Sequence, residues 1–136
     1  SPQAITGPRI GLAVYEAARL AWPDRAWSLK APNDLFLNGK KVAGLLLESV
    51  SEGQNFRLLV GLGLNVTNHP RAFNEATHLT EGGPPVDEAD WFRFLDTLKA
   101  EISGALHEIT QRQLSPAACQ QLARALNANP ARPFDV

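Results

Sequence analysis

The residues best suited to chemistry gather between Lys30 and Glu48. Asn33 and Asp34 enter a predicted strand that β-propensity would not choose for them, and Lys41 follows soon after in the next strand. Polar groups placed against local preference, beside a lysine, indicate a functional site rather than a simple connection. A plainer alternative also fits the spacing. The Pro-Asn-Asp segment at 32–34 would then be an ordinary turn, and Lys40 and Lys41 would be a solvated hairpin end.

A tight hairpin places these groups. Asn38-Gly39 lies between two apolar runs, which is the strongest short-range signal for a two-residue β-turn. Around it the sequence predicts strands over 26–30, 35–37, 40–50 and 56–66, with a further polar turn at 51–55 centred on Gly53. Four neighbouring strands of this kind can form a stable sheet, which a lone hairpin could not.

Glycines on the last two strands indicate a close approach to the backbone. Alternation puts Gly61, Gly63 and Asn65 on one face of their strand. With Gly44 of the facing strand they predict a groove, bordered by Asn33, Lys41 and Asn65, that suits a flat and partly polar ligand. Tight packing of the first helix against the same glycines is the open alternative.

Lys41 poses a geometric difficulty for this groove. Strict alternation along the strand would place Lys41 on the face opposite to Gly44 and Leu46. Two solutions stay open: a β-bulge between these residues, or a lysine stem that curls round from the hairpin end.

Helical spacing is clear in three segments. The first runs from Ile10 to Ala21, with Pro8 in its first turn and Thr6 as a cap. A long amphipathic helix runs from an Asp87 cap to about Thr110, and a third starts at Ser115-Pro116. The apolar stripe of the long helix is core-forming and comprises Trp91, Phe94, Leu95, Leu98, Ile102, Ala105, Leu106 and Ile109.

Bulk properties exclude several classes of protein. The chain has 136 residues and a formal charge of −1, so it fits one domain and lacks the clustered cations of a nucleic-acid surface. Its single cysteine, Cys119, excludes an internal disulfide and is compatible with a cytoplasmic setting. No apolar run is long enough to span a membrane. His69 and His78 lie in a predicted loop without evident metal-ligand partners, which favours surface residues over metal ligands.

Three linked motifs resemble the catalytic domain of the biotin–protein ligases, the biotin-[acetyl-CoA-carboxylase] ligase family. That family has Lys-Trp-Pro-Asn-Asp, then Lys-aliphatic-Ala-Gly-aliphatic-Leu-aliphatic-Glu, then Gly-x-Gly-aliphatic-Asn. Here they are Lys30-Ala-Pro-Asn-Asp34, Lys41-Val-Ala-Gly-Leu-Leu-Leu-Glu48 and Gly61-Leu-Gly-Leu-Asn65. Their order, spacing and strand context agree from Ile10 to Val66. The resemblance implies an α+β fold, a mixed and largely antiparallel sheet packed against helices, of the class II-synthetase-like biotin/lipoate ligase type.

The resemblance also implies an ATP-dependent reaction. Biotin is activated to biotinyl-5′-AMP and then transferred to a lysine of a carboxylase's biotin-acceptor domain, with Mg²⁺ accompanying ATP. By the same resemblance Lys41 is catalytic and binds biotin. The implied biotin pocket is completed by Gly44, Leu46 and Gly61, and the implied nucleotide site by Asn33, Asn65, Lys30 and Asp34. A magnesium ion near Asn65 and a homodimer formed through the sheet are further expectations; nucleic-acid and membrane partners are not.

The chain departs from the family pattern in three ways. The family's Gly- and Arg-rich loop precedes the first helix, and nothing in 1–9 matches it; the expected tryptophan is Ala31. We expect residues 1–128 to be a catalytic domain that lacks its N-terminal part, and 129–136 to begin a linker to an absent C-terminal β-domain. Two alternatives remain: a non-catalytic domain of ligase-like fold that binds biotin or a partner, and a lipoate-handling relative.

Overall fold

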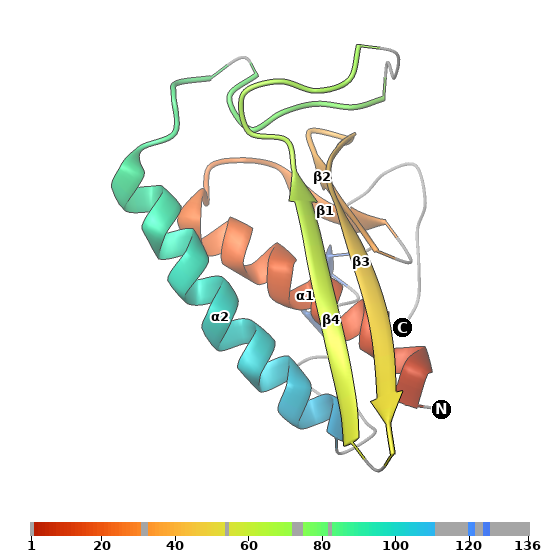
Figure 1. Cartoon of the computed structure of the whole chain (residues 1–136). Helices are drawn as coiled ribbons and strands as arrows, with labels where there is room; N and C mark the ends of the chain where they lie inside the picture. Colours follow the sequence, from red (N-terminus) through yellow and green to blue (C-terminus); the bar gives the residue numbers. More distant parts are fainter. Residues whose placement is uncertain are drawn as a thin grey trace.

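The computed structural model describes residues 2–30, 33–53, 55–71, 75–81, 83–110, 120–121 and 124–125. Two helices, α1 (Pro2–Ala21) and α2 (Glu88–Thr110), lie against one side of a four-stranded sheet (Figure 1). The strands are β1 (Trp27–Lys30), β2 (Asp34–Leu37), β3 (Lys40–Glu52) and β4 (Asn55–Leu64). They pair in sequence order, each antiparallel to the next. The predicted α+β architecture is therefore confirmed.

Local sequence explains the two tight turns. Asn38 and Gly39 both adopt positive φ angles, of 54° and 78°, as a type I′ turn requires. Gly53 has a φ of 61° in the second turn, where Glu52 pairs with Asn55. These turns fix the register of β3 against both of its neighbours, and register decides which side chains share a face.

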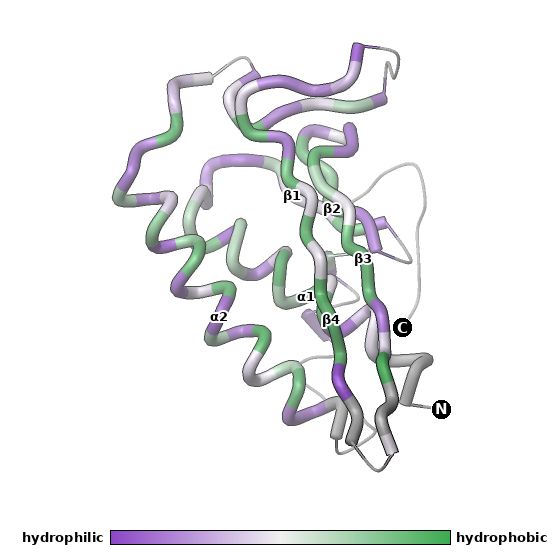
Figure 2. Tube along the Cα trace, viewed as in Figure 1, coloured by the Kyte–Doolittle hydropathy of each residue, from purple (hydrophilic) through white to green (hydrophobic). Residues whose placement is uncertain are grey.

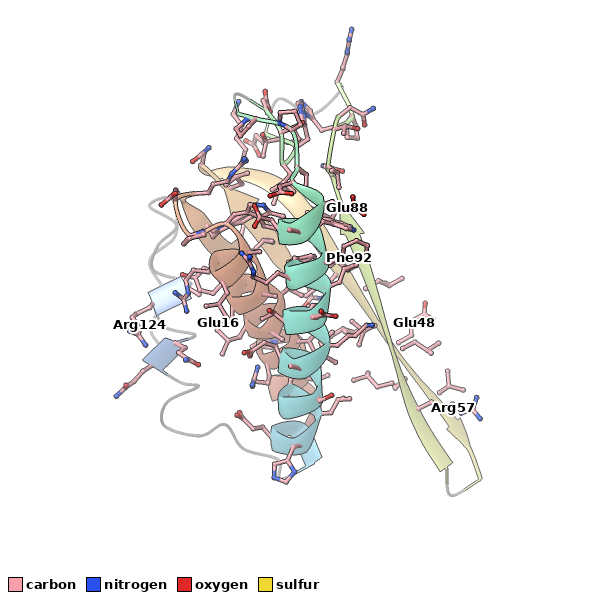
Figure 3. All side chains as sticks on the ribbon, turned by 90° about the vertical axis from the view of Figure 1, so that its left-hand side faces the viewer. Glu16, Glu48, Arg57, Glu88, Phe92 and Arg124 are labelled. Atoms are coloured by element: carbon pink, nitrogen blue, oxygen red, sulfur yellow. The ribbon has the colours of Figure 1, made fainter. Side chains whose placement is uncertain are left out.

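Alternation divides β3 and β4 between a packed face and an open face. Leu45 and Leu62 pack into the core, whereas Leu46 and Leu59 are more than half exposed on the other side. Figure 3 shows Glu48 and Arg57 projecting from these strands away from α2. The predicted grouping of Gly61, Gly63 and Asn65 on one face agrees with this division, because the residues that alternate with them, Leu62, Leu64 and Val66, pack against the core.

The core lies between the helices and the packed face of the sheet. The apolar residues at helical spacing in α1 are all buried, and they are Ile10, Ala13, Val14, Ala17 and Ala21. Phe94 of α2 stacks against Trp22, with ring centroids 5.3 Å apart, and Trp27 donates its indole N–H to the carbonyl of Trp22 at 2.9 Å. Aromatic contacts therefore join both helices to the end of the sheet where β1 begins.

The helix predictions are partly right. Asp87 caps α2 as expected, because its carboxylate accepts the backbone N–H of Ala89 at 3.1 Å. The predicted start of α1 is wrong: the helix begins at Pro2 and Pro8 lies inside it. Proline removes one helical hydrogen bond, but it does not end a helix whose following residues are held by the core. None of the helices in the described part of the chain is long and apolar enough to cross a membrane.

Only fragments of the third predicted helix fall within the described residues. Gln120, Gln121, Arg124 and Ala125 are helical, and Ala125 is fully buried against the core. Ala31, Cys119 and the linker predicted at 129–136 lie outside the described residues.

Candidate functional site

A cavity of about 450 Å³ opens at the end of the sheet where β2, β3 and β4 meet the loop that follows β4. Its lining combines charged, amide and apolar groups with bare backbone. The lining residues are Lys30, Asp34, Phe36, Lys41, Ala43, Gly44, Gly63, Asn65, Pro70, Glu75 and Ala76. Five of the predicted site residues are in this set: Lys30, Asp34, Lys41, Gly44 and Asn65.

A β-bulge brings Lys41 onto the face of the cavity. Asp34 pairs with Gly44 and Leu35 with Ala43, but Phe36 pairs with Lys41, so Val42 is an extra residue in β3. Val42 and Ala43 are both buried although they are consecutive. The bulge resolves the difficulty posed by strict alternation and is the first of the two solutions left open by the sequence.

The Lys41 ammonium group lies over the bare backbone of Gly44. A Cβ added to Gly44 would lie 3.5 Å from Cε and 3.6 Å from Nζ of Lys41. The same nitrogen is 3.4 Å from Oδ1 of Asp34, and the lysine side chain is half exposed. This arrangement leaves the cation paired with one carboxylate but accessible to a second anion from the cavity.

A second cation lies on the same side. Nζ of Lys30 is 5.6 Å from the ring centroid of Phe36, within the range of a cation–π contact. Phe36 offers an apolar surface between the two lysines of the lining. Strand alternation places it beside Asp34, so the sequence contained a signal for Phe36 that the motif analysis missed.

The floor of the cavity, which is formed by bare glycine backbone, involves fewer glycines than the sequence predicted. Gly44 and Gly63 are paired across β3 and β4, and both line the cavity. Gly61 pairs with Leu46 two residues further along the ladder, and neither of these two lines the cavity. They continue its floor along the open face, where Leu46 is 63% exposed.

Asn65 forms hydrogen bonds with the loop that follows β4, and this loop forms one wall of the cavity. Its backbone N–H donates to the carbonyl of Val42 at 2.9 Å, and its side-chain amide donates to the carbonyl of Thr77 at 3.1 Å. Its own carbonyl accepts the N–H of Leu79 at 2.9 Å. Asn65 therefore joins the end of β4 to residues 75–79 as well as lining the cavity.

The same loop pairs directly with Lys41. The N–H of Lys41 donates to the carbonyl of Glu75, and the N–H of Thr77 donates to the carbonyl of Lys41, both at 2.8 Å. These bonds hold Ala76 beside the lysine and bring Pro70, Glu75 and Ala76 into the lining. Sequence patterns within one strand carry no signal for such a contact between distant segments.

Asn33 occupies a different place from the other predicted residues. It does not line the cavity, and its side-chain Oδ1 is buried without a hydrogen-bond partner among the described residues. That oxygen lies against Gly7 of α1, 2.8 Å from where a Cβ would stand. Its backbone carbonyl accepts the N–H of Leu45 at 3.0 Å. This position gives Asn33 a contact with the first helix.

The arrangement suits an anionic ligand with a flat body. Two ammonium groups supply charge for a carboxylate or phosphate, and the Gly44–Gly63 pair lets a planar group approach the backbone. Oxygen-bearing side chains of Asp34, Asn65 and Glu75 are of the type that Mg²⁺ prefers, so a nucleotide with its metal fits the lining.

Comparison with known proteins gives a consistent result. Residues 9–65 match the Biotin/lipoate A/B protein ligase family. A biotin–[acetyl-CoA-carboxylase] ligase of Paracoccus denitrificans is 46% identical over 63 residues, which are 45% of this chain and 26% of that protein. A biotin–[acetyl-CoA-carboxylase] ligase of Mycobacterium tuberculosis is 37% identical over 97 residues, covering 68% of this chain and 35% of that one.

Solved structures agree with the sequence matches. The apo biotin protein ligase of Aquifex aeolicus superposes with a TM-score of 0.68 at 27% identity, covering 89% of this chain and 52% of that one. The complex of the Aquifex aeolicus ligase with biotin and ATP gives a TM-score of 0.67 at 28% identity, covering 89% and 50%. The chain thus spans about half the length of these solved relatives.

Proposed function

Since the chain belongs to the biotin–protein ligase family, we propose that it is the central part of a catalytic domain that activates biotin with ATP. In the first step the biotin carboxylate attacks the α-phosphate of ATP, which forms biotinyl-5′-AMP and releases pyrophosphate. In the second step the amine of an acceptor lysine attacks the activated carbonyl and AMP leaves. The acceptor we propose is the biotin-acceptor domain of a carboxylase.

The observation that carries the proposal is the position of Lys41. Its ammonium group lies over the Gly44 backbone in the cavity. A cation that holds a carboxylate against a phosphate must occupy a position of this kind. Negative charge shifts among the carboxylate, the phosphate and the leaving group during the first step. A fixed cation at this point orients the carboxylate and stabilises that charge.

The other residues take roles that follow from their positions. Gly44 forms the floor beneath the reacting carboxylate, and Gly61 with Leu46 extends that floor along the open face for the apolar part of biotin. Lys30 and Asn65 line the part of the cavity proposed for the nucleotide, with Asp34 beside Lys41. The resemblance assigns Asn33 to the nucleotide as well, but the geometry of the cavity gives that role no support.

The proposal includes Mg²⁺ because this ion accompanies ATP. When bound, Mg²⁺ neutralises phosphate charge and assists departure of pyrophosphate. Asp34, Asn65 and Glu75 are the lining residues that offer it oxygen ligands. The use of ATP agrees with the cytoplasmic setting expected from the sequence.

A homodimer through the sheet stays a prediction. β4 is an edge strand of the sheet, and the exposed Leu59 lies on its open face. An edge strand presents unpaired backbone groups that a second copy can match.

Two measurements on the chain test the proposal. Calorimetry with a non-hydrolysable biotinyl-adenylate analogue should show binding that weakens markedly in Lys41→Ala. A pyrophosphate-release assay with biotin and ATP should show turnover that depends on both substrates. Absence of binding of both biotin and the analogue refutes the proposal.

Intermediate results select the alternatives. Binding of the analogue without pyrophosphate release favours a non-catalytic domain of ligase-like fold. Preference for lipoate over biotin favours a lipoate-handling relative.

A further inference from the structure

Two histidines and a glutamate meet outside the cavity, in the loop between β4 and α2. Nδ1 of His69 lies 2.8 Å from Nδ1 of His78, and Oε2 of Glu81 lies 3.7 Å from the first nitrogen and 3.9 Å from the second. Both histidine side chains are about one-fifth exposed. This differs from the interpretation of His69 and His78 as separate surface residues, since Glu81 supplies the carboxylate partner that the sequence analysis missed.

The three atoms surround a common point at metal-binding distance. The three separations define a triangle whose centre lies about 2.0 Å from every corner, which matches zinc–imidazole and zinc–carboxylate bond lengths. Among the described residues this is the one such group of three. We propose that His69, His78 and Glu81 bind a divalent transition-metal ion, with zinc as the preferred ion.

Hydrogen bonding alone accounts for only part of this arrangement. Two facing Nδ1 atoms at 2.8 Å form a hydrogen bond when one ring is protonated there. The carboxylate, however, is too far from either nitrogen to bond with it, yet it is nearly equidistant from both. Tetrahedral coordination needs the two nitrogens to separate by about half an ångström, which small side-chain rotations supply.

A neighbouring hydroxyl group orients the Glu81 carboxylate. The hydroxyl of Thr77 donates to Oε2 of Glu81 at 2.5 Å and fixes its orientation, as outer partners of metal ligands commonly do. A glutamate carboxylate is ionised at neutral pH, so Oε2 of Glu81 is available as a ligand.

The position of the group indicates a structural role. His69 lies on the arm that leaves β4, whereas His78 and Glu81 lie on the arm that leads towards α2, in a loop that Figure 2 shows as mostly hydrophilic. The two arms are also joined by backbone bonds from Leu79 to Asn65 and from Thr80 to Val66. A metal ion here would fasten together the arms that carry Pro70, Glu75 and Ala76, which form one wall of the cavity.

Metal titration of the untagged chain tests the proposal. We expect one equivalent of Zn²⁺ to bind in calorimetry and to raise the thermal midpoint, and Co²⁺ to give the visible spectrum of a low-coordinate site. His69→Ala and His78→Ala should each weaken Zn²⁺ binding by roughly 100-fold or more, because removing a ligand costs at least as much as removing an outer partner. Glu81→Gln, which changes a single charge, should weaken it by about tenfold or more.

Controls separate a built site from incidental binding. His107→Ala removes the remaining histidine of the chain, in the last turn of α2, and should leave the affinity unchanged. Far-ultraviolet circular dichroism without metal establishes that each variant is folded. Several weak equivalents, or equal loss in all three histidine variants, would mean an adventitious ion only and would overturn the proposal. No binding to the wild-type chain would overturn it as well.

Discussion

Lys41 and Gly44 face the same cavity although they are three residues apart on one extended strand. Val42, the extra residue of the bulge, shifts the alternation by one and turns Lys41 to the side of Gly44. Backbone bonds to Glu75 and Thr77 then hold the lysine backbone on its other edge. The backbone therefore decides the face of the sheet on which the cation lies.

Replacing this cation should weaken ligand binding, whereas replacing its neighbour should not. Lys41→Gln removes a charge from the cavity, and Lys40→Gln removes one from the exposed hairpin end. A lost hydrogen bond to a charged group amounts to about 1.5–3 kcal/mol, so affinity for the biotinyl-adenylate analogue should fall about 10- to 100-fold in Lys41→Gln. Calorimetry at two salt concentrations measures both variants. Equal losses in the two would show that only the overall charge matters.

A side chain on the glycine floor should block the cavity without harming the fold. A Cβ on Gly63 would meet no atom nearer than the carbonyl oxygen of Gly44, at 4.0 Å, so Gly63→Val fits the strand. Valine also favours strands over glycine by up to about 1 kcal/mol. We expect an unchanged or higher urea midpoint together with at least tenfold weaker binding of the analogue. Unimpaired binding would place the ligand elsewhere on the sheet.

The sequence predicted the parts of this fold that local chemistry decides. Asn38-Gly39 specifies its turn because few other pairs accept positive φ twice, and Asp87 specifies a helix start by its carboxylate. The open face of β4 followed from alternation alone. Alternation also placed Gly44 and Asn65 at one predicted groove, whereas Lys30 and Asp34 were assigned to the nucleotide site only through the resemblance to the biotin–protein ligases.

The sequence did not predict the contacts between segments that are distant along the chain. Nothing local to Lys41 indicates that Glu75 and Ala76 lie beside it, because that contact depends on the path of a whole loop. The meeting of His69 with His78 depends on the same path. The bulge at Val42 was one of two acceptable solutions, and only tertiary packing of the buried Val42 and Ala43 selects it.

The ion pair between the two helices should contribute more than an exposed pair. Nε of Arg9 lies 3.1 Å from Oε2 of Glu108, and the arginine side chain is 8% exposed with its Nη1 unpaired among the described residues. Glu108→Ala leaves a nearly buried charge without its partner and should lower the free energy of unfolding by about 2–4 kcal/mol. Urea denaturation measures this loss.

Two variants control that experiment. Arg93→Met breaks the exposed pair with Asp90 on α2 and should cost less than about 0.5 kcal/mol. The double variant Arg9→Met, Glu108→Leu removes both charges and should be more stable than Glu108→Ala. A double variant as unstable as the single one would mean that packing of the side chains, and not the unpaired charge, explains the loss.

Alkaline pH should destabilise the chain through Tyr15, its single tyrosine. Burial, followed by the charge of Glu16, raises the pKa of the Tyr15 phenol above its ordinary value of 10.0, against the opposing effects of Arg19 and Arg124. The folded state thus keeps the proton to higher pH than the unfolded state does. The associated stability is complete below pH 10.0 and is lost as the pH rises through the pKa of the folded protein.

Ultraviolet difference absorbance of the phenolate reports Tyr15 alone and should give a midpoint above 10.0 in the folded chain. Glu16→Gln should lower that midpoint, because it removes a negative charge and also releases Arg19, which Glu16 holds through two hydrogen bonds. In Tyr15→Phe the loss of stability between neutral and alkaline pH should be smaller than in the wild-type chain. A midpoint at or below 10.0, or an identical alkaline loss in Tyr15→Phe, would show that water reaches the phenol despite its packing against the core.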